Sequence, residues 1–115
     1  MTRELPDVPF ADAKARAVAA LAALGFGVLT EIDIKTTLKK KLGVDVAEHT
    51  ILGACNPNLA HRALEAEPWL SLLLPCNVVV RAREGGGSIV AAVSPRAMFQ
   101  IAGNPRIEGV ADESE

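Results

Sequence analysis

The stretch "GFGVLTEIDI", residues 25–34, decides the fold because the spacing of its apolar residues differs from that of the segment before it. In that earlier segment, apolar residues recur at every third or fourth position, as in an amphipathic helix: Phe10, Ala13, Ala17, Leu21 and Leu24. Gly25 is the kind of residue that ends a helix. After it, apolar and polar residues alternate with the period of two that is typical of a strand with one buried face.

We therefore predict a helix over residues 10–24 and a strand over residues 26–34. Alternation divides the strand into two faces. The core side is expected to carry Phe26, Val28, Ile32 and Ile34, and the other side Leu29, Glu31 and Asp33. On the same non-core face of the sheet we expect Asn77, Val79, Arg81 and Arg83, a mixture that is too apolar to be covered by water alone.

The rest of the chain predicts short elements joined by tight turns. They are a basic helix from about Thr36 to Gly43, a strand over 50–55, a helix capped by Asn56 with Pro57 in its first position, a strand over 72–83 interrupted by Pro75, a glycine hairpin over 84–87 and a returning strand over 88–93. Residues 2–5 would add a first strand, and helices are expected from Pro95 to Gly103 and from Asn104. This order favours an α+β fold, an antiparallel sheet with helices on one face.

Composition limits the classes of function. The 115 residues (12.1 kDa) predict one domain, and the formal charge of −2 provides no broad basic surface for nucleic acid. The start "MTRE" lacks the features of a secretory signal, and the longest nearly apolar run, residues 69–80, is too short to span a membrane. Two cysteines do not make a disulfide framework, so we expect a cytoplasmic protein.

Three segments together resemble one family: "GFGVLTEIDIKTTLKKKLGVD", "ILGACNPNLAHRALEAEP" and "LLLPCNVVV". It is the bacterial and archaeal family known as domain of unknown function 302. The resemblance implies a fold like that of the TATA-box-binding protein (strand, helix, four strands, helix) and a homodimer, and it implies no established activity. Compared with the family, the single domain 1–115 looks clipped at both ends. Resemblance to a DNA-binding fold does not by itself carry DNA binding.

The two cysteines are each followed by asparagine, in Cys55-Asn56 and Cys76-Asn77. We expect both pairs to lie at one rim of the sheet, with Cys76 on the core side. Packing is the favoured role of the thiols, because free cysteine behaves as a small buried hydrophobe. The alternatives are a soft-metal site, a reversible disulfide or a nucleophile. His49 and His61 alone could complete a metal site, and no catalytic constellation is recognisable.

A second candidate is a small polar pocket for an anion or metabolite. Asp33 and Lys41 are expected to join Cys55, Asn56, Cys76 and Asn77 as ligand-binding residues, the amides giving orientation and lysine giving charge. The sequence indicates no particular cofactor. Two function classes remain: a non-enzymatic homodimeric binding or assembly module, which we favour, and a thiol-dependent redox, metal-binding or catalytic protein using Cys55 and Cys76.

Overall fold

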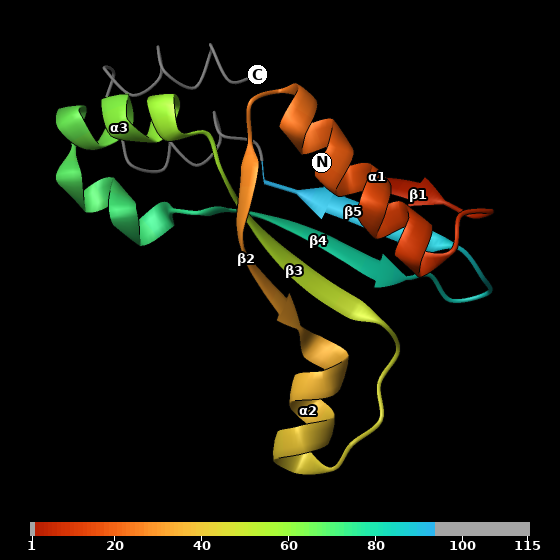
Figure 1. The fold of residues 1–115 in the computed structure, drawn as a ribbon. Coiled ribbons are helices and arrows are strands. Elements are labelled where there is room, and N and C mark those ends of the chain that lie inside the picture. Colours follow the sequence, from red (N-terminus) through yellow and green to blue (C-terminus); the bar gives the residue numbers. More distant parts are fainter. Residues whose placement is uncertain (1, 94–115) are drawn as a thin grey trace.

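The computed structural model describes residues 2–93 (Figure 1). Its elements are, in chain order, β1 (Thr2–Leu5), α1 (Phe10–Ala23), β2 (Gly27–Asp33), α2 (Ile34–Leu42), β3 (His49–Cys55), α3 (Pro57–Ala66), the 3-10 helix η1 (Pro68–Leu73), β4 (Cys76–Ala82) and β5 (Ser88–Ala92). The helices predicted from Pro95 and Asn104 lie outside the described residues.

Local signals set several of these boundaries. Helix α1 ends where Gly25 takes a left-handed φ of 85°, which lets the N–H of the next residue, Phe26, reach back to the carbonyl of Leu21 (2.8 Å). Helix α3 begins where the side-chain oxygen of Asn56 accepts a hydrogen bond from the Leu59 N–H (3.2 Å), with Pro57 following in the first position. These predicted helix boundaries are confirmed.

The five strands form one sheet in the order β1-β5-β4-β3-β2, and every neighbouring pair is antiparallel. The predicted α+β class with an antiparallel sheet is therefore confirmed. Glycines 85–87 close the hairpin between β4 and β5, and each has a positive φ. Strands β1 and β2 are the two edges of the sheet.

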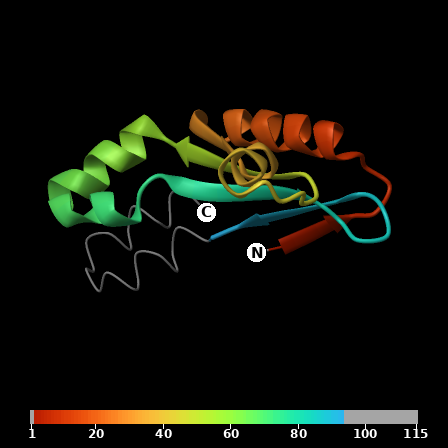
Figure 2. The same ribbon diagram turned by 90° about the horizontal axis from the view of Figure 1, so that it is seen from below.

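Helix α1 covers one face of the sheet (Figure 2). The core lies between them, where Ala13 of α1 meets Leu52, Val78 and Val80 of the two central strands, and all four are buried. Partly buried residues surround this cluster: Leu5, Val8, Phe10, Ala17, Leu21, Val28, Val90 and Ala92. We call the opposite side of the sheet, on which no helix of residues 2–93 packs, the open face (Figure 2).

The predicted facing of β2 is wrong beyond Val28. The register shifts between Val28 and Thr30, because a bulge inserts one extra residue into the strand. Ile32 consequently stands opposite Ile51 on the open face. Glu31 stands opposite the buried Leu52, on the α1 side, where its carboxylate forms an ion pair with Lys14 of α1. Asp33 shares that side.

Helices α2 and α3 extend from opposite ends of the sheet, and α1 is the helix within residues 2–93 that covers a face (Figure 1). One further expectation needs correction. The strand predicted over 72–83 begins only at Cys76, because residues 68–73 form η1 instead. Pro68 occupies the first position of η1, and the Glu67 side chain accepts a hydrogen bond from the Trp69 N–H (3.2 Å). Leu70 of η1 is buried against Ala63 of α3 in a second, smaller core.

Candidate functional site

The structure brings the two Cys-Asn segments together at one end of the sheet. Cys55 is the last residue of β3 and Cys76 the first residue of β4, and these strands are neighbours. In the register Ala54 stands opposite Cys76, so Cys55 is one residue beyond that pair. Both cysteines are free and half-buried.

The two thiols have different surroundings. Cys76 occupies the same side of its strand as Val78 and Val80, as expected, and it packs against the small core of Ala63 and Leu70. Burial raises the pKa of the Cys76 thiol, and the nearby Cys55 adds to the rise. Because side chains alternate along β3, Cys55 lies on the open-face side of the sheet. Its register partner in β2 is Gly27. The pair is therefore close along the backbone but directed to opposite faces, which is poor geometry for a disulfide.

The two asparagines do different things. Asn56 is the cap of α3. Asn77 stands exposed on the open face, opposite Gly53, and no hydrogen bond of its side chain is found within residues 2–93. Gly53 is buried because the Thr30 side chain and the ring of Pro75 both lie over it.

The structure does not place Asp33 and Lys41 with the Cys-Asn segments. In β2, Gly27 is the partner of Cys55, whereas Asp33 is six residues further on and pairs with Thr50. At the rise of an extended strand this separates them by about 20 Å. Lys41 is exposed on α2, which extends from the Asp33 end of the sheet (Figure 1). The predicted pocket combining all six residues is therefore wrong in its geometry.

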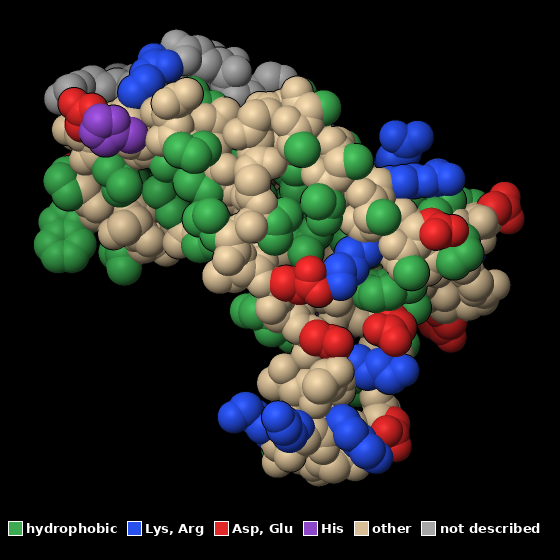
Figure 3. All heavy atoms as spheres, in the orientation of Figure 1, with side chains coloured by type: hydrophobic (Ala, Val, Ile, Leu, Met, Phe, Trp, Pro, Cys, Tyr) green, Lys and Arg blue, Asp and Glu red, His purple; other side chains and the backbone are tan. Residues whose placement is uncertain are grey.

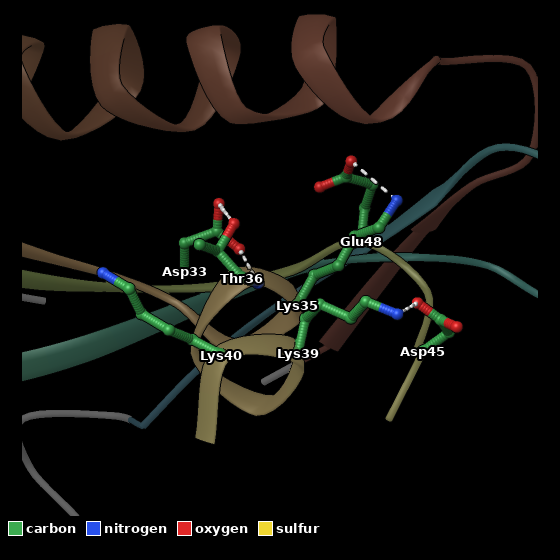
Figure 4. A pocket seen from close by; sticks show the side chains of 7 residues that line it. All are labelled: Asp33, Lys35, Thr36, Lys39, Lys40, Asp45 and Glu48. Carbon is green, nitrogen blue, oxygen red and sulfur yellow. Dashed lines mark hydrogen bonds and ion pairs between the residues drawn. The ribbon is translucent and has the colours of Figure 1, made fainter. Parts of the chain in front are cut away.

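Asp33 instead caps α2. Its carboxylate accepts hydrogen bonds from the backbone N–H and the hydroxyl of Thr36, both at 3.0 Å, and these bonds lower the pKa of Asp33 (Figure 4). An open hollow of about 430 Å³ lies beside this cap, with ion pairs Lys35–Glu48 (3.5 Å) and Lys39–Asp45 (3.1 Å) in its wall. Lys35 and Lys39 are thus paired with carboxylates at the surface, which is the usual state of a solvated helix face.

Sequence reasoning missed a row of apolar side chains that crosses the open face. Ile32, Ile51, Val79 and Ala91 are direct partners in four adjacent strands, so they form one apolar row across the sheet. Thr2 of β1 ends the row. Val79 was predicted on this face, but Ile32 was assigned to the core because the bulge has no clear signal in alternating sequence. We call these four apolar residues the apolar row.

Within residues 2–93, no three His, Cys, Asp or Glu side chains are grouped closely enough to hold a metal ion. His61 is exposed and lies 3.2 Å from the carboxylate of Glu65 on the next turn of α3. In the same part of the chain no helix is both long and apolar enough to cross a membrane.

Comparison with known proteins decides the family. The family model described as "Domain of unknown function DUF302" matches residues 1–115. This chain belongs to the DUF302 family. The crystal structure of an uncharacterized conserved DUF302 protein from Bacillus stearothermophilus is similar to it, with a TM-score of 0.86 and 25% sequence identity over 98% of this chain and 87% of that one. No curated protein matches this DUF302 chain.

The thiols of this DUF302 protein should differ in reactivity. At pH 8, Cys76 is expected to react with an aromatic disulfide reagent about tenfold more slowly than Cys55, because burial disfavours its thiolate. The single variants Cys55→Ser and Cys76→Ser assign each rate, and in denaturant the two rates should become equal. Fast native labelling of Cys76, with a thiol pKa below the usual value, would instead favour thiol chemistry.

Proposed function

We propose that this DUF302 protein is a non-enzymatic binding or assembly module that works as a homodimer through the open face of its sheet. The observation that carries the proposal is the apolar row, because four apolar side chains in direct register form a continuous stripe. Ile32 is 46% exposed, although it belongs to a paired strand and its side chain is on a sheet face rather than on a loop. A contiguous apolar surface of this kind is typical of an interaction site.

Polar residues border the apolar row on both sides. Thr30 and Asn77 flank it toward the Cys-Asn rim, and His49 and Arg81 flank it toward the other end. An apolar centre with a polar border is the usual anatomy of a protein interface. A second copy can meet such a surface about a two-fold axis, since the same row then packs on itself.

The area of the open face can be compared with the area that known interfaces bury on each partner. Five strands about 4.8 Å apart and up to seven residues long give a face of about 20 Å by 20 Å. The accessible area of a pleated face exceeds this plan area, and a typical stable interface uses about 800 Å² on each partner. The plan area of about 400 Å² is about half of that figure, which places the open face toward the small end of specific interfaces.

The thiol-dependent alternative has weaker support. Cys55 and Cys76 share one end of the sheet, so a ligand bound there with Asn56 and Asn77 stays a prediction. Against thiol chemistry, the pKa of Cys76 is raised, and a nucleophile needs a lowered pKa or an adjacent base. We also propose that the protein works in the cytoplasm, where its two free cysteines would stay reduced.

Light scattering on the full chain at micromolar concentration tests the dimer. The expected mass is twice 12.1 kDa. Ile32→Glu should shift the equilibrium toward the monomer by at least about tenfold, because a carboxylate would be buried in the apolar row of the interface. Val18→Glu is the matched control: Val18 is 38% exposed on α1 and lies away from the open face, so its variant should remain dimeric.

Two results would contradict the proposal. One is a wild-type mass of 12.1 kDa at every concentration tested. The other is a dimer that Ile32→Glu leaves intact while circular dichroism shows an unchanged fold, since that dimer would use another surface.

A further inference from the structure

A groove of about 550 Å³ lies between α1 and the edge of the sheet formed by β1 and β5. Most of the α1 side chains there are small, namely Ala13, Ala17 and Ala20, and this leaves room between the helix and the strands. Three apolar residues of the strands complete its walls: Leu5, Val90 and Ala92. The groove is on the α1 side of the sheet, so it is separate from the open face.

Two arginines also line this groove, Arg3 of β1 and Arg16 of α1. Arg3 is the register partner of Val90, which places it on the α1 side of the edge strand. Figure 3 shows basic side chains gathered at this margin of the molecule, over α1 and β1.

Within residues 2–93, neither arginine has an ion-pair partner. Other basic residues nearby are paired, as in Lys14 with Glu31 and Arg83 with Glu4 (3.3 Å). Arg3 and Arg16 make no ion pair or hydrogen bond within residues 2–93, although Asp12 is four residues before Arg16 on the same helix. Two like charges beside an apolar hollow favour a ligand that brings the opposite charge with an apolar body.

We propose that this groove binds a medium-chain alkyl carboxylate. The alkyl chain lies along the alanines of α1, a length of about 10 Å from Ala13 to Ala20. The carboxylate lies between Arg3 and Arg16, because guanidinium groups match carboxylate geometry with two parallel hydrogen bonds. This inference goes beyond the proposed dimer and does not depend on it.

Calorimetric titration of the full chain with decanoate, at submillimolar concentration, pH 7 and fixed salt, tests the proposal. The expected result is one decanoate per chain. Decyltrimethylammonium has the same chain with the opposite charge, and acetate has the same carboxylate without the chain. Both are expected to bind at least about tenfold more weakly, because each lacks one of the two complementary parts.

Variants locate the site. Arg16→Gln and Arg3→Gln are each expected to weaken decanoate binding by about tenfold, the loss of one charge-assisted contact. Lys41→Gln is the matched control, since it also removes one positive charge, but from an exposed position on α2 away from the groove, and its variant should bind like the wild type. The proposal is overturned if decyltrimethylammonium binds as well as decanoate, if decanoate does not bind, or if Lys41→Gln lowers the affinity as much as Arg16→Gln.

Discussion

Replacing Leu52 by alanine is expected to lower the free energy of unfolding by about 3 kcal/mol. Leu52 is fully buried in β3, at the centre of the cluster that joins α1 to the sheet. This loss has two parts. One is the favourable free energy of burying the removed atoms, and the other is the cost of the cavity left behind, since neighbours in the sheet can collapse only in part. In urea unfolding, the midpoint should fall while the slope stays the same.

Leu72→Ala is the matched control, because it removes the same atoms from a side chain that is 80% exposed in η1. Its effect on the free energy of unfolding should stay within about 0.5 kcal/mol. If the two variants lost equal stability, the core described between α1 and the sheet would be incorrect.

Gly53→Ala is expected to lower the free energy of unfolding by about 2 kcal/mol through overpacking. A Cβ atom at this position would lie inside van der Waals contact with Oγ1 of Thr30 and 2.9 Å from Cγ of Pro75. The ring of Pro75 cannot rotate away, so β3 or the segment before β4 would have to shift. Thermal unfolding of the variant at a fixed protein concentration measures the loss.

Two companion variants make this prediction specific. Gly27→Ala should have a neutral or slightly stabilising effect, because a Cβ at Gly27 meets no atom within 4 Å. Thr30→Ala removes Oγ1, the closer of the two atoms that a Cβ at position 53 would meet. The double variant Thr30→Ala, Gly53→Ala should therefore be about 1 kcal/mol more stable than the sum of the two single changes predicts. Strict additivity of the two changes would show that Thr30 does not lie over Gly53.

Local sequence determined much of the fold. Helix α1 was predictable because its apolar spacing and Gly25 act within one or two turns. The start of α3 was predictable for the same reason, since Asn56 needs only the N–H of Leu59 three residues later. The glycine hairpin between β4 and β5 likewise depends on the positive φ of consecutive glycines. The meeting of the Cys-Asn segments followed once β3 and β4 were taken as neighbours.

Tertiary structure alone decided which side chains share a surface. Alternation predicts strand faces only while no residue is inserted, and the bulge after Val28 reversed the facing of Ile32 and Glu31. Asp33 was separated from Cys55 because it lies at the other end of β2, a distance that residue spacing does not specify.

The groove beside α1 has the same origin. Arg3 and Arg16 line one hollow only because β1 pairs with the last described strand, β5, while α1 packs on β5. Local propensity acts over a few residues, whereas strand pairing joins Arg3 to Val90 across most of the chain. The sequence by itself therefore determined the elements and their caps, and packing between distant segments determined the apolar row and the groove.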